Sequence, residues 1–150
     1  MSKRNNSRKA ARLDEFNDQV GLSYKYSNHI SFSFELFCKD ENSQHFTQWQ
    51  EERTLADLNE KLCSFSGKTL RELMSDKTLE TYSGYPQDSE FTCPNHVQGD
   101  GFQWARLRLT GRRRLIGALI QDGKQRDHAV FYVVFLDGDH QFAPSKKKHT

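Results

Sequence analysis

Two stretches of the sequence decide the predicted fold: FQWARLRLTGRRRLIGALI at residues 102–120 and AVFYVVFL at residues 129–136. A Thr-Gly turn divides the first stretch into two strands, over 102–109 and 113–120. The second stretch is a continuous apolar run, which is typical of a central strand covered on both faces. An Asp-Gly pair lies in the connection before it, as in many hairpins. The C-terminal third therefore predicts a three-stranded antiparallel meander.

The first of these strands has an ambiguous facing pattern. Phe102 and Trp104 point to one face of an ideal strand, whereas Leu107 and Leu109 point to the other. Two explanations stay open: a β-bulge switches the facing within the strand, or other elements cover both faces of the sheet.

The N-terminal half contains one clear strand pattern, at residues 30–38. Apolar and polar side chains alternate there, which predicts a half-buried strand over the whole segment. Its apolar side would carry Ile30, Phe32, Phe34, Leu36 and Cys38. Residues 45–49 begin either a second strand or a short helix.

Helical spacing of apolar residues predicts three helices, over 11–20, 55–64 and 69–75. Thr54 is the expected N-cap of the second. The expected inward-facing residues are, for the three helices in turn, Leu13, Phe16 and Val20; Leu55, Leu58 and Leu62; and Leu70, Leu73 and Met74. Residues 76–100 are rich in turn residues and predict a long connection.

Together these elements predict the α+β class: an antiparallel sheet with a C-terminal meander and short helices packed on one face. A chain of 150 residues is long enough for one domain with a core. We expect that domain at residues 13–143, after a flexible basic arm at 1–12 and before a basic tail at 144–150.

Charge is distributed unevenly along the chain. Residues 21–100 hold seven Lys/Arg and thirteen Asp/Glu, whereas residues 101–150 hold ten and four. The basic part is suited to phosphate backbones. Alternatively, the two regions neutralise each other across the fold.

The sequence lacks the motifs that are typical of several classes of function. The three cysteines form no CxxC pair, and Cys93 with His96 is a CxxH without a second half, so neither a disulfide framework nor a metal site is expected. The sequence has no nucleotide-binding glycine loop and no GxSxG elbow, so no cofactor is expected. It also shows no apolar run of membrane-spanning length and no secretory signal, so we expect a cytoplasmic protein with no membrane partner. The oligomeric state stays open.

One segment of the predicted meander, the nine residues 106–114, contains five arginines. Arg106 and Arg108 alternate along one strand and share a face, and Arg112, Arg113 and Arg114 follow at the turn. Guanidinium groups bind phosphates through paired hydrogen bonds and are costly to bury without anions. The cluster indicates a nucleic-acid-binding surface; the alternative is a solvated face that pairs with the acidic middle of the chain.

His140 follows the most apolar strand, after Asp137-Gly-Asp139. Histidine transfers protons near neutral pH, and rigid strand ends are common positions for site residues. The alternative is a histidine that caps the turn by hydrogen bonding to Asp137 or Asp139.

Aromatic side chains are interleaved with the arginines, a combination that holds single-stranded RNA. Phe131 and Phe135 are expected in the core, whereas Trp104 and Phe142 are the candidates for an exposed role. The tail adds three cations, Lys146, Lys147 and Lys148.

The C-terminal third resembles the small toxins of the RelE/ParE group of bacterial toxin–antitoxin modules. RRLIG at residues 113–117 and VFYVVFLD at residues 130–137 are similar to that group's paired strands, and DHQF at 139–142 is similar to the His-containing end of some members. The group packs N-terminal helices on an antiparallel sheet. The resemblance implies a metal-independent endoribonuclease that cuts mRNA on the ribosome and is neutralised by an antitoxin protein.

The resemblance also implies roles for individual residues. A base activates the RNA 2′-hydroxyl, cations stabilise the charge that develops on the phosphate, and an acid protonates the leaving oxygen. His140 would transfer the proton, and Arg112 and Arg114 would stabilise the phosphate. The remaining nucleic-acid contacts would come from Arg106, Arg108, Arg113, Trp104 and the three tail lysines.

Two other functions stay open on the sequence. One is a non-catalytic module that binds nucleic acid or an acidic protein through the basic C-terminal face. The other is an interaction protein whose acidic middle segment docks a basic partner.

Overall fold

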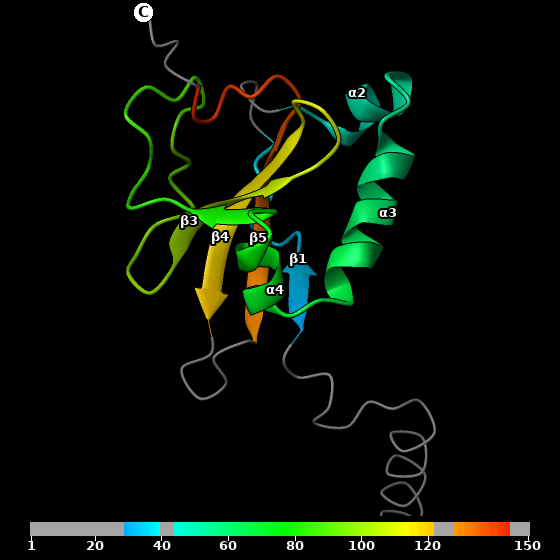
Figure 1. The fold of residues 1–150 in the computed structure, drawn as a ribbon. Helices are drawn as coiled ribbons and strands as arrows, with labels where there is room; N and C mark the ends of the chain where they lie inside the picture. The colour runs from blue at the N-terminus through cyan, green and yellow to red at the C-terminus, as the bar shows by residue number, and fades with distance from the viewer. Residues whose placement is uncertain (1–28, 40–43, 122–127, 145–150) are drawn as a thin grey trace, which may run out of the picture.

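The computed structural model describes residues 29–39, 44–121 and 128–144. In chain order these residues form β1 (Ile30–Ser33), α2 (Phe46–Glu51), α3 (Leu55–Ser66), α4 (Leu70–Ser75), β2 (Leu79–Thr81), β3 (Gln103–Arg108), β4 (Arg114–Gln121) and β5 (Ala129–Asp137) (Figure 1). The helix predicted over 11–20, the basic arm and nearly all of the basic tail lie outside the described residues. Within the described residues, no helix has the length and apolar character needed to cross a membrane.

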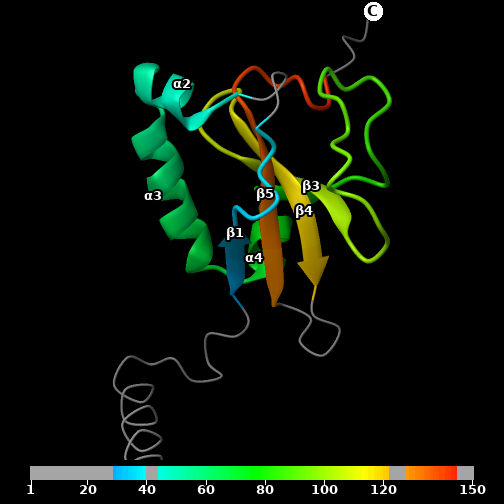
Figure 2. The same cartoon turned by 180° about the vertical axis from the view of Figure 1, so that it is seen from behind.

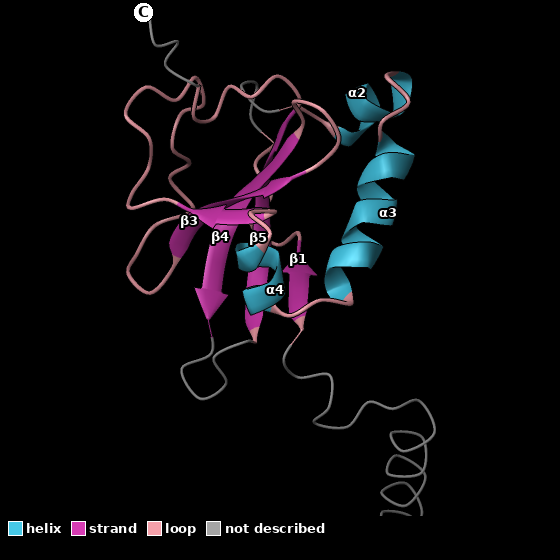
Figure 3. Ribbon diagram, in the orientation of Figure 1, coloured by secondary structure: helices cyan, strands magenta, loops and turns pink. Residues whose placement is uncertain are grey.

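All five strands belong to one sheet, in the order β1-β5-β4-β3-β2, with helices beside it (Figure 3). β3, β4 and β5 form the predicted antiparallel meander, and β2 adds antiparallel to β3. β1, however, pairs with β5 in parallel, so the α+β class is confirmed but the expectation of a purely antiparallel sheet is wrong. Alternation of residue types indicates which side chains are buried, but it carries no information about strand direction.

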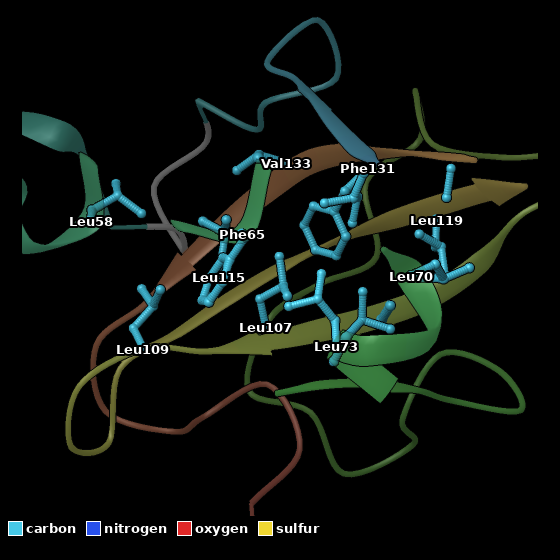
Figure 4. Close-up of a cluster of buried hydrophobic side chains, with 14 of the residues drawn as sticks. Leu58, Phe65, Leu70, Leu73, Leu107, Leu109, Leu115, Leu119, Phe131 and Val133 are labelled. Carbon is cyan, nitrogen blue, oxygen red and sulfur yellow. The ribbon is translucent and has the colours of Figure 1, made fainter. Parts of the chain in front are cut away.

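Different kinds of structure cover the two faces of the sheet. On the helix face, α2, α3 and α4 enclose a mostly aliphatic cluster, much of which Figure 4 shows. On the loop face, a second and more aromatic cluster is buried; its members are Cys38, Phe91, Val97, Trp104, Ile116, Ala118, Val134, Phe135 and Phe142. The prediction that the helices pack on one face is confirmed.

Coverage of both faces explains the facing pattern of β3. Trp104 is buried on the loop face, whereas Leu107 is buried on the helix face. The register shifts instead between β4 and β5, where Val134 is passed over in the pairing. Because of this bulge, the consecutive residues Val134 and Phe135 both face the loop-face cluster. Other residues of β5 belong to the helix-face cluster, so this strand contributes to both cores.

The strand predicted over 30–38 is shorter than its alternation suggests. β1 ends at Ser33 and a turn follows, which leaves Phe34 44% exposed. Downstream of the turn, the backbone N–H of Cys38 donates to the carbonyl of Val134, 2.9 Å away, at the bulge of β5. A parallel partner cannot keep its register through a bulge, and this explains why β1 stops before it.

The helices predicted over 55–64 and 69–75 are confirmed as α3 and α4, with differences in detail. Thr54 does precede α3, but its hydroxyl donates to the Trp49 carbonyl instead of capping the helix. α3 also runs two residues further than predicted, so Phe65 joins its buried stripe. In α4, Leu73 is buried but Met74 is 39% exposed, so the inward orientation expected for Met74 is wrong. A helix of six residues covers the sheet with too narrow a stripe to bury both neighbours.

The connection predicted over 76–100 contains β2, a strand too short to be recognised from alternation. Leu79 pairs with Leu107 and is buried on the helix face. After β2, residues 82–102 form the long loop that covers the loop face, seen from behind in Figure 2. Residues 46–51 form the short helix α2 rather than a strand, which settles the alternative left open at 45–49.

Candidate anion-binding site

An open pocket of about 380 Å³ lies where β4 begins and β5 ends. We call it the turn pocket; its lining residues are Gly111, Arg112, Arg114, Asp139, His140 and Pro144. It lies between the β3–β4 turn and the segment that follows β5, yellow and red in Figure 1. The three residues predicted as catalytic, His140, Arg112 and Arg114, are therefore brought to one place.

Asp137 holds the segment that carries His140. Its carboxylate is buried and accepts hydrogen bonds from the backbone N–H groups of Gln141, at 2.8 Å, and Phe142, at 2.9 Å. His140 has a φ of 58°, a left-handed conformation that is uncommon for residues other than glycine. The carboxylate therefore caps the turn through backbone amides, and the proposed capping role of His140 is wrong.

Gln44 holds the same segment from the other side. Its Oε1 accepts hydrogen bonds from the Trp49 indole at 2.6 Å and from the Gly138 backbone N–H at 2.9 Å, and its Nε2 donates to Asp139 at 3.3 Å. A Cβ on Gly138 would lie 2.4 Å from Gln44 Oε1, so a larger residue there would force the Gln44 side chain to move. Gln44 and Gly138 are 94 positions apart, and nothing local in the sequence identifies Gln44 as a site residue.

Arg114 and Arg112 contribute differently to the turn pocket. Arg114 Nη1 donates to the carbonyls of Gly111 and Arg113, both at 2.9 Å, which folds the side chain back over the turn. Burial is the main cause that lowers the pKa of Arg114, followed by repulsion from Arg106 and Arg108. Arg112 is exposed on the wall of the pocket. Arg114 therefore supplies fixed positive charge, and Arg112 supplies donors that can turn toward a ligand.

The environment of His140 favours its neutral form. Partial burial lowers the pKa of the imidazole below its usual 6.5, and the positive charge of Arg114 lowers it further, with smaller contributions from Arg106 and Arg112. Asp137 acts in the opposite direction but does not reverse the shift. At neutral pH the imidazole is therefore uncharged and able to accept a proton.

The remaining arginines are bonded elsewhere. Arg106 Nη2 lies 2.7 Å from Glu80 Oε2 on the neighbouring strand β2. Arg108 reaches the carbonyl of Asp76 at 3.5 Å. Arg113 turns to the helix side, where its Nη2 lies 3.4 Å from Asp57 Oδ2 in α3. Pairing with the acidic middle of the chain is thus correct for Arg106 and Arg113, while Arg112 and Arg114 line the turn pocket.

Trp104 and Phe142 are core residues, and the exposed role expected for them is wrong. Trp104 is 6% exposed and Phe142 is fully buried. Tyr85, from the loop after β2, packs edge-on against both rings, with centroids 5.1 and 5.2 Å away. The alternation of side chains along a strand predicts which face of the sheet each ring lies on. It does not reveal that a loop distant in the sequence covers that face. The three tail lysines, Lys146, Lys147 and Lys148, lie outside the described residues.

In the described part of the chain, no group of three or more His, Cys, Asp or Glu side chains is placed to hold a metal ion. Cys38, Cys63 and Cys93 are not joined by disulfide bonds. No known family, curated protein or solved structure matches the chain. What the turn pocket can do follows from its own chemistry: two guanidinium groups and a neutral imidazole suit a ligand with an anionic group next to a weakly acidic hydroxyl.

Proposed function

We propose that the protein binds the backbone of RNA in the turn pocket and cleaves it without a metal ion. The observation that carries the proposal is the meeting of Arg112, Arg114 and His140 around one open pocket. An RNA phosphodiester offers the matching groups, an anionic phosphate and a neighbouring 2′-hydroxyl.

In the proposed reaction, His140 accepts the proton of the 2′-hydroxyl, and the 2′ oxygen attacks the adjacent phosphorus. The bond between phosphorus and the 5′ oxygen breaks, which leaves a 2′,3′-cyclic phosphate and a 5′-hydroxyl end. The imidazolium, or water, returns a proton to the 5′ oxygen. Arg112 donates to the non-bridging oxygens, and the charge of Arg114 stabilises the phosphorane-like transition state.

Among the described residues that line the turn pocket, Asp139 is the one acidic residue. Its carboxylate accepts a hydrogen bond from Gln44 and opposes a bound phosphate. We place the phosphate on the Arg112 side of the pocket for this reason.

The proposal extends to a toxin of a toxin–antitoxin module, which acts on mRNA at the ribosome and is neutralised by an antitoxin protein. Support for this biological role comes from the resemblance of residues 113–117 and 130–137 to RelE/ParE toxins. Residues 114–117 of the first segment lie in β4 and the second segment lies in β5, the two strands whose ends border the turn pocket.

The experiment that tests the proposal is cleavage of end-labelled RNA by the full chain in the presence of EDTA. Loss of a general base slows a reaction by about 10² to 10⁴-fold, and we expect His140→Ala to do so while RNA binding persists. His96→Ala is the matched control, because His96 is exposed and does not line the turn pocket. RNA with a 2′-deoxyribose at the cut position should bind but resist cleavage.

A different outcome would favour the alternative, a non-catalytic binding module. In that case RNA stays intact, His140→Ala has no effect, and Arg112→Ala weakens binding. Affinity that falls steeply with added salt would show that phosphate contacts carry the interaction.

A further inference from the structure

A second hollow, of about 440 Å³, borders the same segment after β5 as the turn pocket does. It is lined by residues 82–87 of the loop after β2 and by Ala143 of the segment after β5. We call it the tyrosine hollow, after Tyr82 and Tyr85. The next residue in the chain, Pro144, lines the turn pocket, so consecutive residues of one segment border the two sites.

Electrostatic interaction also links the two sites. The charges of Arg106 and Arg114 act on the hydroxyl of Tyr82, where they oppose the burial that raises its pKa. Arg114 lines the turn pocket. The hydroxyl of Tyr82 is therefore within electrostatic reach of Arg114, whose charge we assign to the transition state.

The aromatic wall of the tyrosine hollow is held firmly. Tyr82 packs against the buried ring of Phe142, with centroids 5.5 Å apart, and remains partly exposed. The hydroxyl of Tyr85 donates to the carbonyl of Phe91 at 2.6 Å, and burial raises the pKa of Tyr85 to about 12. A preformed aromatic surface loses little conformational entropy when a flat ring stacks on it.

We infer that the tyrosine hollow takes a nucleobase of the strand whose phosphate occupies the turn pocket. A base can enter only when it is unpaired, so the substrate class is single-stranded RNA. Stacking on tyrosine tolerates any base, because every base has an aromatic face. This inference rests on the proposed function, and it adds a base subsite to the phosphate site.

Gly84 offers a way to fill the tyrosine hollow without disturbing the core. It lines the hollow, and a Cβ placed on it meets no atom within 4 Å. Gly84→Leu should therefore fold normally and occupy the space of the base. Gly84→Ala is the matched control, since it makes the same backbone change and adds little volume. Tyr82→Leu is a second variant, which removes the aromatic face.

The test compares two 2′-O-methyl oligoribonucleotides, which lack the attacking hydroxyl and cannot be cleaved. One carries all its bases, and the other is abasic at its central positions. For the wild-type chain and for Gly84→Ala we expect the complete oligonucleotide to bind more tightly, by about five-fold to a hundred-fold per stacked base. Gly84→Leu and Tyr82→Leu should bring the two affinities together, with thermal unfolding unchanged in Gly84→Leu.

Two results would overturn the base subsite and can be told apart. If wild type binds both oligonucleotides equally, and Arg112→Ala weakens both, the phosphate site stands and the base subsite is wrong. If neither oligonucleotide binds, the proposed function fails, and the subsite fails with it.

Discussion

The two faces of the sheet are built by different means, and the difference explains where the candidate site lies. Helices cover the helix face, and their own backbone hydrogen bonds are internal, so they need to contribute only apolar side chains. Loops cover the other face and must satisfy their backbone groups with side chains such as Asp137 and Gln44. The buried carboxylate of Asp137, the aromatic packing and the tyrosine hollow therefore belong to the loop face.

The two buried clusters also differ in their residue types. The helix-face cluster is dominated by leucine, whereas the loop-face cluster contains stacked rings such as Phe91 and Phe135, with centroids 4.9 Å apart. Large flat rings fill the irregular space beneath a loop and bury a large area each. The loop face thus has a core of its own, beside which the turn pocket lies.

Removing one ring from that core should have the largest effect on stability. Phe142→Ala deletes a fully buried side chain that five other aromatic residues contact, and should lower the free energy of unfolding by about 3–5 kcal/mol. Phe34→Ala, at a 44% exposed position, should cost less than about 1 kcal/mol. Chemical denaturation measures both. Equal losses would mean that the loop face is not a true core.

The next largest effect should come from the carboxylate that holds the loop. Asp137→Ala leaves the backbone N–H groups of Gln141 and Phe142 without their acceptor, and should cost about 2–3 kcal/mol. Asp139→Ala is the matched control: this carboxylate is exposed, and its loss should cost under about 0.5 kcal/mol. A small loss at Asp137 would show that the loop holds its shape without this cap.

A smaller and purely electrostatic effect is expected at His140. The folded-state pKa of this residue lies below 6.5, so its imidazole gains a proton only at acidic pH, and folding stability falls as pH drops below 6.5 through that pKa. Removing a nearby positive charge favours the imidazolium. Arg114→Gln should therefore raise the pKa of His140, and Arg112→Gln should raise it less.

NMR titration of the imidazole resonances measures these shifts directly, and His140→Gln identifies the signal. A downward shift in Arg114→Gln, or no shift, would show that Arg114 does not act on His140.

The smallest effect is expected from the ion pair on the helix side. Arg113 and Asp57 have side-chain exposures of 24% and 31%, and a double-mutant cycle should give a coupling of about 0.2–1 kcal/mol. Arg113→Ala should also leave RNA affinity unchanged, in contrast to Arg112→Ala one position earlier. A loss of affinity in Arg113→Ala equal to that in Arg112→Ala would remove the distinction between the two faces.

Local patterns predict much of the fold. The apolar run of β5, the arginine-flanked strands β3 and β4, and the leucine spacing of α3 are all visible in a few consecutive residues. β2 is missed because three residues cannot show a period, and the end of β1 is missed because it depends on a bulge in another strand. Local sequence also does not determine that β1 runs parallel to β5.

The residues of the candidate site also divide into those that can be predicted from the sequence and those that cannot. Arg112, Arg114 and His140 can be proposed from residue type and from their positions at a turn and a strand end. Gln44 and the tyrosine hollow cannot, because their partners lie far away in the chain. The burial of Trp104 and Phe142 cannot be predicted for the same reason: the loop that buries them begins at residue 82, some twenty residues before Trp104.

The sequence by itself determined the strands of the meander, the helices α3 and α4 and the residue types that meet at the end of the sheet, because these depend on periodicity, turn chemistry and charge. Only the tertiary structure decided which arginines are paired, which aromatic residues are buried, and that a second hollow borders the same segment as the turn pocket. Those properties depend on which distant segments cover each face of the sheet, and coverage is a contact between residues that no local pattern relates.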